Sequence, residues 1–436
     1  MFDVIIVGGR PAGASLAARL GAAGLTVLVL DKARFPSRPP VSAPFVLPHT
    51  LALLDELGVD EAEYAAATPR MREFVLEFSG YFRTRLGFER PVGNRTHFYA
   101  VDRARFDHCL WRKLADHPSV TAVEQARVTE LLREQDGRIA GVKAVVGEGQ
   151  PRTIRARAVI GADGRHSVVA RAVDAAVTEE RRDVDTTLYY AHWEQVAPYD
   201  RDGRTIAHIH TSCDGFSFVF MPTADDQVMV VAQGRADSWA ALDGSPEQIY
   251  ERLLRARPLV WRRLAGARQV SALSGMKRIG NSFRAPGGPG WALVGDAYHQ
   301  KDSLDAQGIY DALLGAKLLA EQLRAWHAGE RTWEQAIERY GAAAHAEHAP
   351  MLAATMDRVK REIYEAPPPP VAKTLLRWVL THPDYGRRFT DLVTRQIDPR
   401  EFMPPPVMLA IAAKGAVERV RAKLRRGDDP TAPLRV

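Results

Sequence analysis

The sequence predicts an α/β protein with three parts: a Rossmann-like unit built on a parallel sheet, an inserted antiparallel sheet, and a helical extension at the C-terminus. The chain opens on a buried strand, a glycine turn and a helix over residues 2–20. Alternating strand patterns fill 186–233, and fully apolar strand texture returns at 290–297. At 436 residues the chain is too long for a single core, which favours two units plus an extension.

The first unit begins as a βαβ element. Residues 4–7 form an apolar run of strand length, 12–20 predict a helix, and 26–30 predict a second buried strand. A unit of about thirty residues of this kind belongs to a parallel sheet that is covered on both faces. Further elements expected along the chain are helices over 49–57 and from about 104, and strands over 74–78, 120–123, 128–132, 141–146 and 156–164, the last ending in a tight turn.

The second unit is predicted from the segments TLYYAHW, TIAHIH, GFSFVFMPT and QVMVVAQ, which indicate an antiparallel sheet with one covered face. We therefore assign 1–73, 99–180 and 275–330 to the nucleotide-binding domain, 74–98 and 181–274 to a substrate domain, and 331–436 to a C-terminal helical region.

The C-terminal region follows a long helix predicted over 306–327 and is broken by prolines at 365–370 and 403–406. Its last helix, over 407–426, has apolar positions near Leu409, Ala413, Val417, Val420 and Leu424, with arginine and lysine opposite. We expect a solvated helix packed on the domain, with contact to anionic lipid as the alternative.

Composition limits the function classes. The formal net charge is +6, and the arginines are scattered without a basic stripe, which suits anionic cofactors or substrates and argues against nucleic acid. The two cysteines, Cys109 and Cys213, give no disulfide framework and no zinc motif. Without a disulfide framework, a reducing cytoplasm is the default expectation. No run approaches the ~20 apolar residues of a spanning helix, so we expect no stable membrane insertion, and a homo-oligomer stays open.

The first glycine turn departs from the dinucleotide pattern G-x-G-x-x-G, because Arg10 stands between Gly8 and Gly13 where the middle glycine is expected. The helix start still offers N–H groups to a pyrophosphate, and Asp31 ends the second strand where a ribose hydroxyl would lie. A capping turn with a surface arginine is the alternative. We predict that Arg10 keeps a negative φ and lies over or beside the cofactor.

Three further segments accompany this turn: VDRARFDHCL at 101–110, VIGADGRHSVVAR at 159–171 and GWALVGDAYHQKDSLDAQGIYDALLGAKLLAEQL at 290–323. In order and spacing the four resemble FAD-dependent monooxygenases of the para-hydroxybenzoate hydroxylase type, over residues 1–330. The chain departs from the hydroxylases at Ser303, Ala306 and Tyr310, where they usually carry proline, glycine and asparagine, and Ser42 replaces a loop arginine. These features are also similar to geranylgeranyl reductases.

The resemblance implies FAD as cofactor and NAD(P)H as reductant. It places Asp296 at the ribityl chain, Arg103 near the phosphates and the helix start at 306–308 against the pyrimidine edge of the flavin. The residues expected to bind the cofactor are Gly8, Arg10, Pro11, Ala12, Gly13, Asp31, Lys32, Ser42, Arg103, Asp163, Gly164, Gly295, Asp296, Ala306, Gln307, Gly308 and Ile309.

Catalytic candidates are His299, Lys301 and Asp302, which lie between the Asp296 turn and the flavin-facing helix; charges that only pair with one another are the alternative.

The substrate candidates lie on two strands. They are His208, His210, Phe218 and Phe220, which could line a substrate cavity or belong to an ordinary core. No third ligand lies near the two histidines in sequence, so we expect no metal site.

The function implied by the resemblance is that of a single-component monooxygenase. NAD(P)H would reduce the flavin, O2 would form a C4a-peroxide, and the oxygen would hydroxylate or epoxidise an electron-rich small organic substrate. A reductase of isoprenoid double bonds is the first alternative. A halogenase is less favoured because the segment W-x-W-x-I-P is absent from the sequence. A nucleotide-binding regulatory protein without turnover is the alternative from another class.

Overall fold

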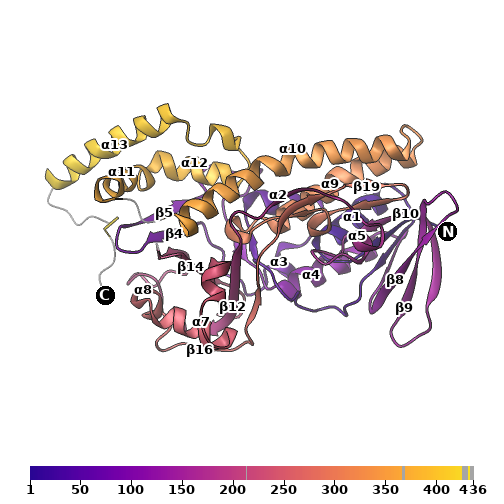
Figure 1. Cartoon of the computed structure of the whole chain (residues 1–436), viewed down its shortest axis with the longest axis horizontal. Helices are drawn as coiled ribbons and strands as arrows, with labels where there is room; N and C mark the ends of the chain where they lie inside the picture. The colour runs from indigo at the N-terminus through magenta and orange to yellow at the C-terminus, as the bar shows by residue number, and fades with distance from the viewer. Residues whose placement is uncertain (213, 366–368, 425–430, 433–436) are drawn as a thin grey trace.

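The computed structural model describes residues 1–212, 214–365, 369–424 and 431–432, and it confirms the predicted α/β class (Figure 1). The first sheet is parallel through its centre, where β1 pairs with both β10 and β2, and β10 pairs with β20. Its path is β19 (Gly287–Gly288), β20 (Trp291–Leu293), β10 (Arg152–Gly161), β1 (Phe2–Val7), β2 (Val27–Leu30) and β7 (Val120–Val123), with β8 (Ala126–Arg133) and β9 (Ile139–Val146) as an antiparallel ribbon on β10.

Helices cover this sheet. α1 (Pro11–Ala22) begins at a proline whose fixed φ suits a first helical turn, and it packs against α9 (Gly308–His327), which in turn packs against α10 (Trp333–Val359). Helix α9 begins two residues later than predicted. Ala306 has a φ of 52° and ends the short helix η3 (Ser303–Asp305), so the predicted start at 306 is wrong.

The second sheet contains the strands predicted for the inserted unit. Its path is β16 (Arg268–Gln269), β12 (Thr186–Glu194), β15 (Val228–Arg235), β14 (Phe216–Pro222), β13 (Ala207–Thr211), β4 (Glu73–Phe78) and β5 (Phe82–Gly87), with β17 (Ser274–Met276) on β12. All pairs are antiparallel except β13 with β4. The domain boundaries inferred from the sequence stay a prediction.

Both faces of the second sheet are covered, contrary to the expectation of one covered face. On one face Phe218, Phe220 and Val230 pack in a cluster with the helices α6 (Ala236–Ala240), α7 (Pro246–Arg255) and α8 (Pro258–Trp261). On the other face Leu188, Met221 and Val231 belong to a cluster that includes side chains of the C-terminal helices. Sequence alternation between apolar and polar residues is weak here because neither face meets water.

The C-terminal region is helical beyond α10. It contains η4 (Lys360–Tyr364), α11 (Pro370–Leu380), α12 (Pro383–Val393), η5 (Pro399–Glu401) and α13 (Pro405–Leu424). Figure 1 shows α11, α12 and α13 at the end of the molecule opposite to β8 and β9, above β4 and β5. Residues 425 and 426 of the predicted last helix lie outside the described residues. Within the described part of the chain no helix is both long and apolar enough to cross a bilayer.

Short elements complete the two units. They are α2 (Pro48–Glu56), α3 (Glu61–Tyr64), α4 (Arg103–Arg112), α5 (Val168–Ala172), η1 (Lys113–Asp116), η2 (Gly295–Ala297), β3 (Phe45–Val46), β6 (Tyr99–Ala100), β11 (Val177–Arg181), β18 (Asn281–Arg284) and β21 (His299–Gln300).

Candidate functional site

A long groove runs along the carboxyl ends of β1, β2, β10 and β20, with a cavity volume of about 960 Å³. This edge is where open parallel sheets bind ligands, and the volume lies at the upper end of the roughly 300–1,000 Å³ that ligand pockets occupy. All the residues predicted to bind the cofactor line this groove except Gly13 and Gln307, and the three catalytic candidates line it as well.

The turn between β1 and α1 has no room for side chains at its two glycines. Gly8 has a φ of +101°, and a Cβ on it would lie 2.5 Å from the Ala162 carbonyl oxygen. A Cβ on Gly13 would lie 1.8 Å from the Gly8 carbonyl oxygen. Helix α1 has no side-chain cap and no acidic residue in its first turn, so its N-terminal N–H groups stay available to an anion.

Asp31 stabilises this turn through hydrogen bonds to the backbone. Its buried carboxylate accepts hydrogen bonds from the Gly9 N–H (2.7 Å) and the Ala33 N–H (2.7 Å). Each carboxylate oxygen keeps a second lone pair, so Asp31 can still accept a bond from a ligand hydroxyl.

Arg10 and Arg103 share one buried carboxylate. Arg10 has a φ of −87°, as predicted, and its guanidinium lies 2.5 Å from an Asp107 oxygen that is 0% exposed. Arg103 donates to the other Asp107 oxygen at 3.0 Å and also to the Ser42 hydroxyl. Two cations against one anion leave a net positive charge in the groove wall, close to the start of α1, and phosphate groups favour such arginine forks.

Two further carboxylates face the groove. Asp163 accepts from the Val168 N–H at 2.7 Å through one oxygen, whereas its other oxygen is buried without a hydrogen-bond partner. Burial raises the pKa of Asp163, against the opposing effect of these donors. Asp296, which belongs to η2, lies 3.1 Å from the Arg165 guanidinium. A polyol or sugar ligand would supply the donor that the free Asp163 oxygen lacks.

The start of α9 holds a buried ionic network. The Lys301 ammonium lies 2.9 Å from Asp311, and Arg395 donates to Asp311 at 2.9 Å and to the Gln307 amide oxygen at 2.7 Å. Burial would raise the pKa of Asp311, but the two cations hold it well below its ordinary value. Lys301, Asp311 and Arg395 together therefore carry one net positive charge beneath the N-terminus of a helix.

The same network ties the C-terminal region to the groove. Gln307 does not line the groove, because its amide donates to the Val393 carbonyl oxygen of α12 at 3.0 Å. Sequence reasoning missed Asp311, Arg395 and His348, whose ring lies 3.5 Å from Asp311. No local motif marks them, since packing of α9 with segments far along the chain brings them together.

His299 is buried between aromatic rings rather than exposed to solvent. It stacks on Phe283 at 4.1 Å and on His348 at 5.3 Å, and its Nε2 has no hydrogen-bond partner. Burial is the main cause that lowers its pKa well below the ordinary value, so the ring is neutral.

Asp302 is fully engaged in structural bonds. Its carboxylate accepts from the Thr186 hydroxyl, from the Gln233 amide at 2.8 Å and from the Leu304 N–H at 2.9 Å. These bonds join the groove to β12 and β15 of the second sheet, which favours a positioning role for Asp302.

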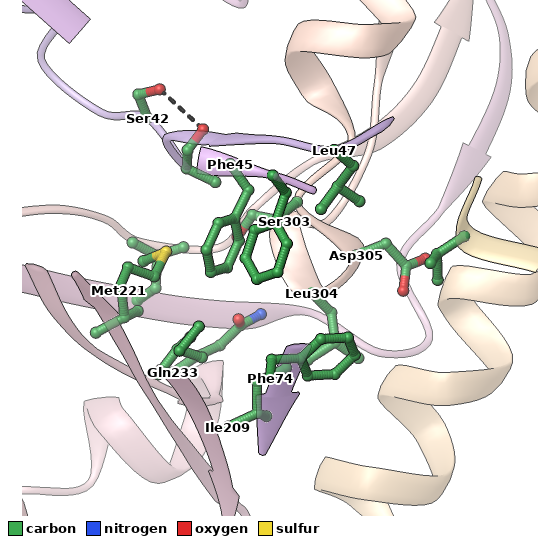
Figure 2. A pocket seen from close by; sticks show the side chains of 18 of the residues that line it. Ser42, Phe45, Leu47, Phe74, Ile209, Met221, Gln233, Ser303, Leu304 and Asp305 are labelled. Atoms are coloured by element: carbon green, nitrogen blue, oxygen red, sulfur yellow. Dashed lines mark hydrogen bonds between the residues drawn. The ribbon is translucent and has the colours of Figure 1, made fainter. Parts of the chain in front are cut away.

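An apolar cavity of about 110 Å³ adjoins the groove, between the second sheet and the C-terminal helices. Figure 2 shows Phe45, Phe74, Ile209, Met221 and Gln233 around it. Its few polar groups include Gln233, Ser303 and the buried ion pair of Asp305 with Arg358. The groove and the cavity share part of their lining, namely Val41, Ser42, Ala43, Leu188, Ser303 and Ala306.

The four substrate candidates do not line this cavity. His208, His210, Phe218 and Phe220 are buried on the opposite face of the sheet, because side chains alternate along a strand and Ile209 and Val219 take the cavity side. The cavity is therefore lined by their neighbours Ile209 and Val219, and the prediction that the four residues line a substrate cavity is wrong for this cavity.

The two histidines meet Glu77, which sequence reasoning missed because β4 lies far away in the chain. His208 Nε2 lies 2.9 Å from Glu77 and His210 Nδ1 lies 3.5 Å from it, all buried. Burial lowers the pKa of His208 to about 3, and the Arg263 guanidinium lies 3.4 Å from its other ring nitrogen. Arg263 already balances the Glu77 charge, so a divalent ion here would add uncompensated buried charge.

Comparison with known proteins identifies one family for most of this chain. The model of a family described as FAD binding domain matches residues 1–355. The chain is similar to the ubiquinone hydroxylase UbiL of Rhodospirillum rubrum, at 27% identity over 74% of this chain and 72% of that protein. It is also similar to a digeranylgeranylglycerophospholipid reductase of Methanopyrus kandleri, at 26% identity over 73% of this chain and 76% of that protein.

Among solved structures, the flavin-dependent brominase Bmp2 superposes with a TM-score of 0.74 over 97% of this chain and 99% of that one. The sequence identity is 18%, so this likeness concerns the fold alone.

Proposed function

Because the chain belongs to the FAD-binding-domain family of flavin-dependent oxidoreductases and monooxygenases, we propose that it is a monooxygenase that oxidises an apolar, electron-rich small molecule with O2 and NAD(P)H. The observation that carries the proposal is the junction of two compartments. A polar groove suited to a dinucleotide opens directly onto an apolar cavity through shared lining residues, among them Leu188, Ser303 and Ala306.

The groove residues hold the cofactor. Arg10, Arg103 and the start of α1 bind the pyrophosphate, while Asp31, Asp163 and Asp296 accept hydrogen bonds from sugar and ribityl hydroxyls. The free oxygen of Asp163 supports this fit. FAD, when bound, supplies the redox chemistry, and the chain supplies position and electrostatics.

In this proposal the network of Lys301, Asp311 and Arg395 stabilises negative charge on the flavin ring of FAD. Its net positive charge adds to the helix dipole at the start of α9, and the three charged side chains are largely buried. Lys301 acts in this proposal through its charge, and no side-chain nucleophile is required.

The cavity selects the substrate by shape and apolarity. Cavities of about 150 Å³ hold a benzene ring, so 110 Å³ suits one ring or the end of a branched chain. The Gln233 amide nitrogen donates to Thr186 and Asp302, so its carbonyl oxygen is the group that can accept a hydrogen bond from one hydroxyl or N–H of the substrate.

A reductase of isoprenoid double bonds is the second candidate. The dry, aliphatic and aromatic lining that surrounds Ile209 and Val219 suits an isoprenoid chain equally well, and one relative carries that activity in its name. The two candidates differ in whether O2 enters the product.

The proposal is tested with purified protein, NADH or NADPH, and a panel of apolar aromatic and isoprenoid compounds. A substrate should accelerate O2 consumption, and Ala207→Phe, which fills the cavity, should abolish the acceleration while bound FAD stays unchanged. Ala207→Gly, which leaves the cavity open, is the control. Acceleration that survives Ala207→Phe, or protein that binds no FAD, would overturn the proposal.

A further inference from the structure

The outward side of α13 is apolar. Leu409 is 67% exposed and Val417 50% exposed, and with Ala413 they recur every four residues, so they share one side of the helix. We call Leu409, Ala413 and Val417 the outer face of α13. The inward side carries Ile411, which is 3% exposed, and Gly415, which packs against the Trp378 backbone of α11.

Helix α11, which packs against α13, also exposes large hydrophobic side chains. Nine large hydrophobic side chains are exposed in the described part of the chain, and five of them lie on α11 and α13. These five are Leu375, Leu376, Met408, Leu409 and Val417. Scattered single residues of this kind are ordinary, whereas a cluster on two packed helices marks an interaction site.

The positive charge of the chain is concentrated in the same region. Residues 370–436 contain 13 lysines and arginines against 7 aspartates and glutamates, whereas the charges of residues 1–369 balance. The whole net charge of +6 therefore belongs to the C-terminal region, which corrects the expectation of a dispersed excess. Lys414, next to the outer face, has 61% of its side chain exposed and pairs with Asp384 at 2.8 Å, and Glu418 is the exposed acid on the same helix.

We propose that α11 and α13 dock on the surface of an anionic phospholipid bilayer. An exposed apolar helix face flanked by lysine and arginine is the combination that binds such surfaces, since the apolar side chains enter the headgroup boundary and the cations meet the lipid charge. A second copy of the chain fits this surface less well, because a symmetric dimer would bring two regions of net charge +6 together.

Docking at this end would place the apolar cavity next to the lipid. Phe389 and Val393 of α12 line the cavity, and Ile411 of α13 belongs to the same hydrophobic cluster. A lipid-dissolved substrate would then reach the cavity through the helical layer without crossing water. This inference goes beyond the proposed reaction, and vesicle binding requires no turnover, so its failure leaves the oxidation untouched.

The test is co-sedimentation of the FAD-loaded protein with vesicles of phosphatidylcholine that contain phosphatidylglycerol. The parent should bind, and the bound fraction should fall at high salt and with vesicles of phosphatidylcholine alone. Leu409→Glu and Val417→Glu together should weaken binding roughly tenfold or more. Val146→Glu is the matched control and should bind like the parent, because Val146 is 41% exposed and ends β9, a strand that lies at the other end of the molecule from α13 (Figure 1).

Two results would overturn the inference. One is a parent protein that does not bind the vesicles, or a double variant that binds them as tightly as the parent. The other is a parent dimer in sedimentation equilibrium without lipid that Leu409→Glu and Val417→Glu dissociate, since the outer face would then be a protein interface. Bound FAD and the circular dichroism spectrum should match the parent in every variant.

Discussion

Arg10 replaces the middle glycine of a dinucleotide turn and brings a positive charge instead. Asp107 neutralises only one of the two guanidiniums that it holds, so loss of Arg10 removes the surplus charge from the proposed phosphate site. Hydrogen bonds to charged groups contribute about 1.5–3 kcal/mol. Arg10→Gly should therefore raise the Kd for FAD about tenfold or more, measured by fluorescence titration of the apoprotein.

Arg38 provides the matched control. It follows Ser37, to which Arg10 donates, and it also forms an ion pair with an aspartate, Asp102, but it does not line the groove. Arg38→Gly should leave the Kd near the parent value. Equal FAD affinity in Arg10→Gly and the parent would show that the Arg10 side chain contributes nothing.

His192 predicts a pH dependence of stability. Burial is the main cause that lowers its pKa to about 4, from an ordinary value near 6.5. In the unfolded chain His192 is protonated as the pH falls below about 6.5, whereas in the folded chain it stays neutral until about pH 4. Stability from this group is therefore lost as the pH falls, by about 2 kcal/mol at pH 5 relative to pH 7.

The variant His192→Phe keeps a buried ring without the titration. Urea denaturation at both pH values gives the free energy of unfolding of each protein, and the value for the variant minus that for the parent should be about 2 kcal/mol larger at pH 5 than at pH 7. A difference that does not change with pH would contradict the assignment of a low pKa to His192.

At the scale of elements, the β1–α1 turn is closed by contact between backbone atoms. A methyl group at Gly13 would overlap the Gly8 carbonyl oxygen, whereas one at Gly308, the first residue of α9, would meet nothing within 4 Å. Gly13→Ala should destabilise the apoprotein by about 3 kcal/mol or more. Gly308→Ala should not, and similar melting temperatures for the two variants would contradict the packing described for α1.

Removing the cation or the anion of the ion pair at the start of α9 should shift the flavin reduction potential in opposite directions. Lys301→Met removes a cation from the network, so the reduced anionic ring should lose stabilisation and the potential should fall by about 30 mV, or about 1.4 kcal/mol for two electrons.

Asp311→Asn removes the anion of the same network and should raise the potential. Both values come from dye-coupled titration of the FAD-loaded variants, whose bound FAD is the control for folding. Shifts of equal sign would show that the network does not act through charge.

At the scale of the whole molecule, the sequence was sufficient for the groove. Gly8, Asp31, Asp163 and Asp296 each follow a buried strand, and parallel strands end at one edge of a sheet, so local motifs predict a shared site.

The cavity could not be predicted in the same way. Both faces of the second sheet are buried, so no polar alternation indicates whether His208 or Ile209 faces the cavity. Arg395 and Glu77 reach their partners only through packing between distant segments.

The proposed function requires that oxygen from O2 enters a substrate held in the apolar cavity beside the groove. Turnover of a cavity-binding compound under 18O2, followed by mass spectrometry of the product, tests this directly. This function predicts a product that carries one labelled oxygen and is not formed by Ala207→Phe. An unlabelled product with reduced double bonds, formed equally well without O2, would contradict it and identify the protein as a reductase.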